Sequence, residues 1–399
     1  MIKRQRISIQ EWKQTLNKNQ IFLSTLDHSS MALRLAISDA SKSLIERETL
    51  VEMIALAAVA GEHLLVIGPP GTAKSEAVRR ISKATGGKYF EYLLGRFTEP
   101  SEIFGPIDLR KLKEGVVETE TREMLPEAEI AFLDEIFQGS TAILNTLLGL
   151  LNERIFIRGH TRIKCPLRVC VGASNALPQD ESLAAFADRF LVRVFVEPIA
   201  DPLLENLLDG GWQLQDYKVA HPAGLKDIDT LAEAALKADL SFVRPKLAYA
   251  IRLLRQAGIM LSDRRAVKSQ RLIAAAAALA GRDKPTEADL WPLIFIVPTP
   301  EQQALARDTL RDLLSQTENL ALPAAAEEAS LGPLARATRL TKAGLQALNE
   351  KPDNKDNEEM NAWRLRLEAI AREIDAGFAQ EQLPTQLADV RTQIVKELG

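Results

Sequence analysis

Cysteine is nearly absent from this chain of 399 residues. Its two cysteines, Cys165 and Cys170, are too few for the disulfide framework of a small secreted protein. Their CxxxxC spacing has no histidine nearby, so it does not predict a zinc site. The four histidines are scattered without ligand spacing and add no metal motif. This composition favours a reducing compartment, and we expect a cytoplasmic protein.

The chain also lacks an excess of charge and a long apolar run. Lys and Arg total 50 against 54 Asp and Glu, a formal charge of -4, which gives no general attraction for the phosphates of DNA or RNA. No apolar run approaches the roughly 20 residues of a membrane span. The basic N-terminus is not followed by an apolar signal segment. We therefore expect no membrane span and no general affinity for nucleic acid.

Aromatic residues make up only 5% of the chain, which favours a helix-rich fold over a β-sandwich. Five short apolar runs separated by helical patterns predict a parallel sheet that is covered on both faces, an α/β fold. These runs are 63–68, 88–94, 129–134, 168–174 and 190–197. Segments with turn signals predict two hairpins inserted in this pattern, at about 109–124 and 154–168.

The remaining segments are expected to be helical. Residues 1–33 predict an N-terminal extension with one short helix, and Leu33–Ala60 predicts two helices that lead into the sheet. Helical periodicity then dominates 199–298, as a second domain, and 299–399, as a C-terminal extension. In the extension we expect a helical bundle whose core contains Trp363, Leu365, Leu367, Ile370 and Ile374.

The sequence GPPGTAKS follows the first apolar run and opens a helix. Such a loop needs glycines so that backbone N–H groups can approach phosphate oxygens, a lysine for the terminal phosphates, and a hydroxyl for Mg²⁺. Ala73 departs from the strict pattern, which has glycine there, and a plain turn before an amphipathic helix is the alternative. The candidate nucleotide-binding residues are Gly68, Pro69, Pro70, Gly71, Thr72, Ala73, Lys74, Ser75 and Glu76.

Two carboxylates, Asp134 and Glu135, end the third apolar run. A carboxylate at the end of a strand can hold Mg²⁺ together with Ser75, and a second beside it can polarise an attacking water. An ordinary helix cap is the alternative. Together with the phosphate loop, this pair favours nucleotide hydrolysis.

Polar side chains elsewhere could complete such a site. Asn175 follows the fourth run and could orient the water, although it could equally be a turn residue. Arg189 could reach the nucleotide of a neighbouring subunit as an arginine finger, or pair with Asp188. Arg264 and Arg265 begin a helix of the second domain and could contact the γ-phosphate, or be a solvated helix start.

In this order, the motifs resemble those of the AAA+ ATPases. The segments YLLGRFTEPSEIFGP, LPEAEIAFLDEI, ILNTLLGLLNER and ASNALP are particularly similar to the MoxR family, near its regulatory ATPase variant A (RavA) branch. Members of that family commonly have alanine or another small residue before the lysine, as at Ala73. The resemblance covers about residues 34–298.

This resemblance implies a division of roles. Lys74 and Ser75 would be Walker A residues, Asp134 and Glu135 Walker B, Asn175 sensor 1, Arg189 the finger and Arg264 sensor 2. Residues 34–198 would be the α/β nucleotide-binding domain and 199–298 the lid. The two hairpins would face a central pore.

The function implied is hydrolysis of ATP with Mg²⁺ in a homo-hexamer that remodels or activates a protein partner, such as one carrying a von Willebrand factor A (vWA) domain. Another helix-2-insert motor, either chelatase-like or DNA-translocating, is an alternative, as is a nucleotide-bound scaffold without turnover. Since every candidate catalytic residue precedes Pro298, we expect 299–399 to be dispensable for the chemistry.

Overall fold

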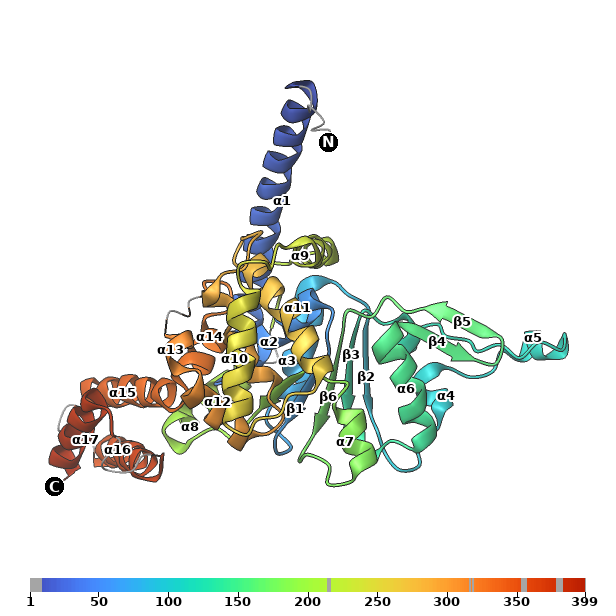
Figure 1. Ribbon diagram of the computed structural model, residues 1–399. Coiled ribbons are helices and arrows are strands. Elements are labelled where there is room, and N and C mark those ends of the chain that lie inside the picture. The colour runs from blue at the N-terminus through green and yellow to red at the C-terminus, as the bar shows by residue number, and fades with distance from the viewer. Residues whose placement is uncertain are drawn as a thin grey trace.

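A five-stranded parallel sheet forms the centre of the computed structural model (Figure 1). The structure describes residues 9–213, 217–315, 317, 319–352, 357–377 and 383–398. The sheet order is β2-β3-β6-β1-β7, and all of its pairings are parallel. The predicted α/β architecture is therefore confirmed. The strands are β1 (Leu64–Ile67), β2 (Tyr89–Leu93), β3 (Ile130–Asp134), β6 (Val169–Ser174) and β7 (Val192–Phe195).

Both faces of the sheet are buried, because successive side chains of a strand enter two different apolar cores. Along β1, Leu64 and Val66 enter one core, whereas Leu65 and Ile67 enter the other. Burial on both faces explains why the strands are uninterrupted apolar runs. The first face is covered by α2 (Glu48–Ala60) and α3 (Lys74–Thr85), and the second by α4 (Pro100–Phe104), α6 (Thr141–Glu153) and α7 (Glu181–Ala187). Two 3-10 turns, η1 (Leu125–Glu127) and η2 (Ile136–Gln138), flank β3.

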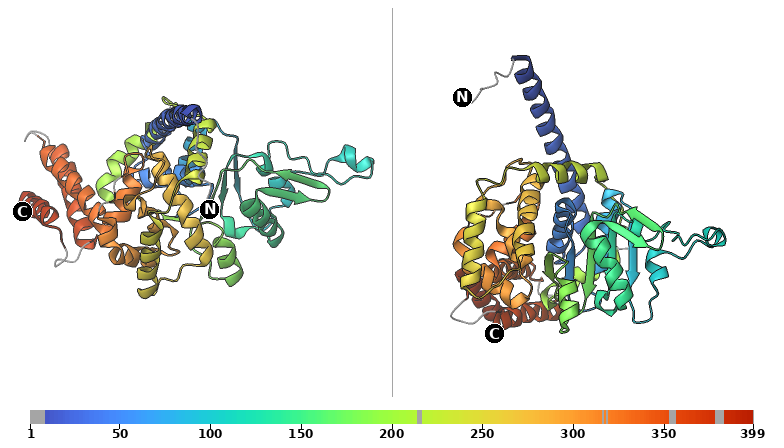
Figure 2. Two further views of the ribbon diagram at one scale, coloured as in Figure 1. Left: turned by 45° about the horizontal axis from the view of Figure 1, so that its top comes forward. Right: turned by 45° about the vertical axis from the view of Figure 1, so that its right-hand side comes forward.

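The N-terminal helix is longer than expected. α1 runs without a break from Ile9 to Ser41, so the short helix expected within residues 1–33 and the first helix after Leu33 are one element. Its C-terminal half packs into the first core through Leu26, Leu33 and Ile37. Its N-terminal half extends away from the body (Figures 1 and 2).

One of the two predicted hairpins forms. β4 (Ile155–Arg158) and β5 (Thr161–Lys164) pair antiparallel, as expected. The prediction of a hairpin at 109–124 is wrong, since its tip is the short helix α5 (Leu109–Lys113) above a single bridge between Ile107 and Thr119. The Asp108 side chain caps α5 by accepting hydrogen bonds from two backbone N–H groups, which stabilises a helical turn where we expected a strand.

The second domain is helical, as predicted. Its helices continue the first core beyond residue 298, because Ala306, Leu310, Leu322 and Ala325 are part of that core. The elements are η3 (Asp201–Leu203), α8 (Leu204–Gln213), α9 (Leu225–Lys237), α10 (Arg244–Gln256), α11 (Asp263–Leu279), η5 (Glu287–Asp289), η6 (Trp291–Ile296), α12 (Pro300–Thr309), α13 (Arg311–Leu314) and α14 (Pro323–Leu331).

The last three helices form a bundle with a core of its own at one end of the molecule (Figure 1), where the bundle also contacts η3. They are α15 (Pro333–Asn349), α16 (Asn357–Gly377) and α17 (Thr385–Leu398). Trp363, Leu367, Ile370 and Ile374 lie in its core, as predicted. Leu365 was wrongly included, since 65% of it is exposed. Within the described ranges, no helix is long and apolar enough to cross a membrane.

Candidate functional site

Three adjacent strands bring the predicted site residues together. β1 lies beside β6, and β6 lies beside β3. Since the three strands are parallel, their carboxyl ends meet at one edge of the sheet. The GPPGTAKS loop follows β1, Asp134 ends β3, and Asn175 follows β6.

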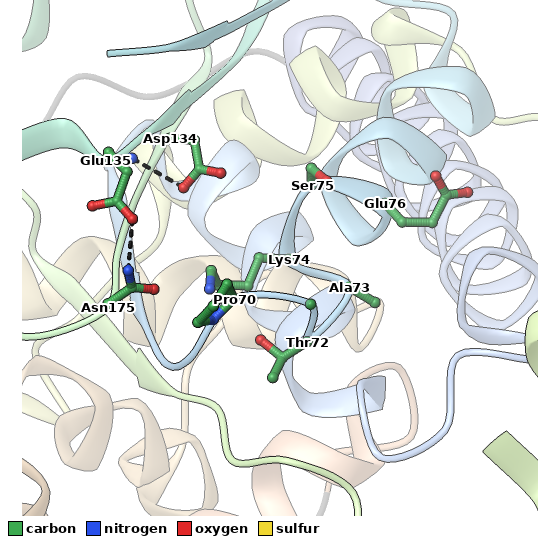
Figure 3. A pocket seen from close by; sticks show the side chains of 10 residues that line it. Pro70, Thr72, Ala73, Lys74, Ser75, Glu76, Asp134, Glu135 and Asn175 are labelled. Atoms are coloured by element: carbon green, nitrogen blue, oxygen red, sulfur yellow. Dashed lines mark hydrogen bonds between the residues drawn. The ribbon is translucent and has the colours of Figure 1, made fainter. Parts of the chain in front are cut away.

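These segments line a cavity of about 470 Å³ (Figure 3). Of the predicted nucleotide-binding residues, Gly68 and Pro69 are outside its lining, and the others are part of it. The lining residues are Pro70, Gly71, Thr72, Ala73, Lys74, Ser75, Glu76, Asp134, Glu135 and Asn175. Glu76 forms ion pairs with Arg79 and Arg80.

The loop contains small residues at three positions for different structural reasons. At Gly68, an added Cβ would lie 2.2 Å from the Val196 carbonyl oxygen, so close packing on the chain after β7 requires glycine. Gly71 has a φ of +78° and open space around it, which suits a loop that must approach a ligand. Ala73 has a φ of +59°, a left-handed conformation that costs a residue with a side chain roughly 1 kcal/mol.

The Lys74 ammonium group lies within the loop. Its Nζ donates hydrogen bonds to the carbonyl oxygens of Gly68 and Pro69, both at 2.8 Å. Burial lowers the pKa of Lys74, and the carboxylates of Asp134 and Glu135 oppose this shift. The loop therefore holds a cation beside two carboxylates at the start of α3, where backbone N–H groups also favour an anion.

Glu135 and Asn175 are joined by a hydrogen bond. The Asn175 amide donates from Nδ2 to Oε1 of Glu135 at 2.7 Å, and the Glu135 N–H donates to Oδ1 of Asp134 at 2.9 Å (Figure 3). The two carboxylates thus lie on one side of the cavity, facing the loop that carries Lys74 and Ser75. Among the described residues, no group of three or more His, Cys, Asp and Glu side chains could hold a metal ion.

Arg189 and Arg264 lie at the opposite edge of the sheet. Arg189 precedes β7, whose first residue pairs with Leu64 at the start of β1. Arg264 donates to Asn152 near the end of α6 at 3.2 Å, and its charge is one cause of the lowered pKa of Arg189, after burial. The length of β1, roughly 13 Å for its four residues, separates both from the phosphate loop of the same chain.

The two arginines at the start of α11 differ in environment. Arg265 is buried and donates to Asp188 and to the carbonyl oxygens of Phe190, Leu191 and Ile296. Asp188 therefore pairs with Arg265. The contacts with Asp188, Phe190 and Leu191 join α11 to the sheet domain, and the contact with Ile296 joins it to η6. Arg265 is therefore a structural residue, which leaves Arg264 as the candidate for nucleotide contact.

Arg47 was not predicted as a site residue. Its guanidinium group is buried, and its Nε donates to the Thr72 carbonyl oxygen in the phosphate loop at 2.8 Å. An isolated arginine before a helix carries no motif, so the sequence gives no signal for this contact.

Comparison with known proteins identifies the family. Residues 31–233, just over half of the chain, match the family model described as the MoxR domain in the MoxR-vWA-beta-propeller ternary systems. Residues 239–309 match an AAA lid domain. The narrower resemblance to the RavA branch stays a prediction.

Individual relatives include one that carries the family's name. Two uncharacterized proteins of Methanocaldococcus jannaschii are each 38% identical over 62% of this chain, which spans 66% and 64% of their lengths. Chaperone MoxR1 of Mycobacterium tuberculosis is 26% identical over 41% of this chain and 44% of its own. A solved structure of a candidate ATPase from Cytophaga hutchinsonii shares the fold, with a TM-score of 0.61 at 16% identity over 76% of this chain and 99% of its own. The chain belongs to the MoxR family of AAA+ ATPases.

Proposed function

We propose that the chain hydrolyses ATP with Mg²⁺ at the cavity between the phosphate loop and Asp134. The observation that carries this proposal is the convergence of Lys74, Asp134 and the bonded pair Glu135–Asn175 on one cavity. A phosphate-binding loop alone would account for binding. Two carboxylates opposite that loop, one of them held by an amide, support turnover and disfavour a passive scaffold.

The donor set fits magnesium bound through a nucleotide. Mg²⁺ prefers one or two carboxylates together with substrate phosphates over a cage made only of protein ligands. The Ser75 hydroxyl and the Asp134 carboxylate lie on facing sides of the cavity and would supply the protein ligands. When bound, the ion would neutralise charge on the phosphate oxygens.

The remaining residues would act directly on the substrates. Lys74 would exchange its carbonyl partners for the terminal phosphates. Glu135 would accept a hydrogen bond from the attacking water, and Asn175 would fix the carboxylate so that the water lies in line with the γ-phosphate.

We further propose that Arg189 and Arg264 act on the nucleotide of a neighbouring subunit. Both lie at the edge of the sheet away from their own phosphate loop, and the Arg189 Nε atom is buried without a hydrogen-bond partner among the described residues. A charge-bearing donor supplied by another subunit would stabilise the transition state. This arrangement requires a ring, for which we propose a homo-hexamer.

The proposed partner is a protein with a vWA domain. The description of the matching family places its MoxR domain in systems with a vWA protein and a β-propeller, and a relative is named a chaperone. Remodelling or activation of such a partner is the proposed outcome of hydrolysis. We propose a cytoplasmic location, on the ground that Cys165 and Cys170 are both free thiols.

Calorimetric titration of ATP with Mg²⁺ into the purified chain tests nucleotide binding. We expect Lys74→Ala to weaken binding about 100-fold, because a buried charge-assisted contact with phosphate is lost. Lys83→Ala, on the exposed face of the same helix, is the matched control and should bind like the unaltered chain. Equal affinity of Lys74→Ala and Lys83→Ala would contradict the proposed site.

Mixing two inactive variants tests the proposed ring. A mixture of Arg189→Ala and Lys74→Ala subunits should recover part of the ATPase rate, since a mixed interface can combine an intact phosphate loop with an intact finger. Subunit exchange is verified with labelled chains. Exchange without recovery would contradict action between subunits.

A further inference from the structure

Arg47 joins three separate segments through their backbone carbonyl oxygens. Its Nε donates to Thr72 in the phosphate loop at 2.8 Å, its Nη1 to Glu46 at 2.7 Å, and its Nη2 to Glu197 at 2.7 Å. The side chain is buried and lies outside the lining of the cavity. Apart from the effect of its charge at a distance, Arg47 can therefore affect a bound nucleotide only through the segments that it holds.

The contact with Thr72 fixes the orientation of one peptide group of the phosphate loop. In a planar trans peptide, the carbonyl group and the following N–H point in opposite directions. A Thr72 carbonyl oxygen directed at Arg47 therefore directs the Ala73 N–H away from Arg47. Ala73 lines the cavity, and Arg47 does not, so an N–H directed away from Arg47 would be able to bind a phosphate oxygen there.

The same peptide group precedes a strained residue. Ala73 has a φ of +59°, which alanine adopts at a cost that glycine avoids. A hydrogen bond from a cation is among the stronger ones in proteins. The bond from Arg47 can therefore hold a loop conformation that the alanine side chain disfavours.

The contact with Glu197 also ties Arg47 to the segment that leads into the helical domain. Glu197 lies between β7 and η3, and the preceding residue, Val196, packs against Gly68 at the start of the phosphate loop. The Arg47 side chain thus fixes the phosphate loop relative to Glu197, in the segment that connects β7 to η3.

We propose that Arg47 is a positioning residue for the nucleotide, holding the Thr72 carbonyl so that the Ala73 N–H faces the phosphates. This inference rests on the proposed function, because it assigns a role to Arg47 in the same site. The positive charge of Arg47 also favours the binding of a phosphate at this position. It contributes to the lowered pKa of Lys74, as expected for a second cation near the position of an anion.

Competition against a fluorescent ADP analogue tests this role. Arg47→Met should weaken ADP binding by about 10- to 100-fold, the loss expected for a hydrogen bond to a charged group. The affinity for adenosine, which has no phosphate, should change by less than about threefold. Arg47→Lys keeps the positive charge but not the planar guanidinium group with its several N–H donors, so its ADP affinity should fall several-fold.

Ala73→Gly provides a readout that a purely structural role would not change. Glycine adopts a positive φ without strain, so the loop depends less on Arg47. Arg47→Met should therefore reduce the ADP affinity less in a chain that also carries Ala73→Gly than in a chain that keeps Ala73. Arg265→Met is the matched control, since that side chain is also buried and also donates to carbonyl oxygens, but at the opposite edge of the sheet.

The possible outcomes separate this inference from the proposed function. If the unaltered chain binds ADP and folded Arg47→Met binds it equally well, the positioning role is wrong and the proposed function stands. Equal losses for Arg47→Met and Arg265→Met, without rescue by Ala73→Gly, would also contradict it. If Arg47→Met does not fold, Arg47→Lys decides, and unchanged ADP affinity there overturns the role. No ADP binding by the unaltered chain would overturn both proposals.

Discussion

At the residue scale, the proposed chemistry depends on a sharp turn after β3. Glu135 has a φ of +48°, a left-handed conformation that non-glycine residues seldom adopt. Asp134 still belongs to the strand, so the turn places two consecutive carboxylates on the same side of the cavity. Asn175 then holds the second carboxylate from the neighbouring strand.

Replacing Asn175 should separate turnover from binding. Asn175→Ala removes the amide that orients Glu135, so we expect the ATPase rate to fall about 10- to 100-fold. ATP affinity should stay within about threefold, because the phosphate loop is unchanged. Steady-state phosphate release and calorimetry measure the two quantities, with the exposed Asn145→Ala as control. An unchanged rate would assign Asn175 to a turn.

Single residues were predictable where a motif specifies them. The phosphate loop, Asp134, Glu135 and Asn175 could be placed from the sequence because each lies at the end of an apolar strand or directly after it. Arg47 and the difference between Arg264 and Arg265 could not, since both depend on which distant carbonyl oxygens lie nearby. Gly68 is likewise required by its close packing on Val196, which no local sequence pattern reveals.

At the element scale, a buried carboxylate connects helices far apart in the sequence. Glu52 on α2 accepts hydrogen bonds from the N–H groups of Ala324 and Ala325, in the first turn of α14. Burial is the largest influence on its pKa and raises it from the ordinary value of 4.5 to about 8, although both N–H groups oppose the shift. The junction between the two helices should therefore respond to pH.

The sign follows from the raised pKa. The folded chain retains a proton on Glu52 that the unfolded chain releases above pH 4.5, so this contribution to stability is complete below that pH and is lost as the pH rises to about 8. Denaturant unfolding should show a loss on the order of a few kcal/mol at most between pH 5 and pH 8. Glu52→Gln should remove this dependence, whereas the exposed Glu233→Gln should keep it. The same pH slope in both variants would contradict the assignment.

Helices and strands were predicted well where the apolar periodicity is strong, and poorly where a single capping residue determines whether a helical turn forms. The five strands and the helices α9, α10 and α11 follow from apolar runs and helical spacing. The segment at 109–124 was misassigned because one N-cap, Asp108, converts alternating residues into a helical turn. The continuity of α1 was missed because its boundaries carry weak signals.

At the scale of the whole molecule, the packing indicates a later boundary for the C-terminal module. Leu310, Leu314 and Leu322 belong to the main core, whereas α15, α16 and α17 share a core of their own. We therefore propose that the separable module begins near Gly332 and not at residue 299. The sequence could not reveal this division, because helices on both sides of Gly332 have similar composition and only long-range contacts distinguish them.

Two truncations test this boundary. A chain that ends at Gly332 should stay folded and bind ADP, because it keeps the whole main core. A chain that ends at Thr299 should unfold at a temperature lower by more than about 10 °C, since it exposes apolar surface on α2 and removes the hydrogen-bond donors of Glu52. Thermal unfolding and ADP titration measure both. Equal stability of the two chains would place the boundary back near residue 299.

The central claim is that Glu135 polarises the attacking water at a site where Lys74 binds phosphate, and ATP turnover by Glu135→Gln tests it most directly. The amide keeps the shape of the side chain and removes its basic oxygen. We predict that Glu135→Gln binds ATP within about threefold of the unaltered chain and releases phosphate at least about 100-fold more slowly, with Glu233→Gln as the surface control. Turnover by Glu135→Gln at the rate of the unaltered chain would contradict the account.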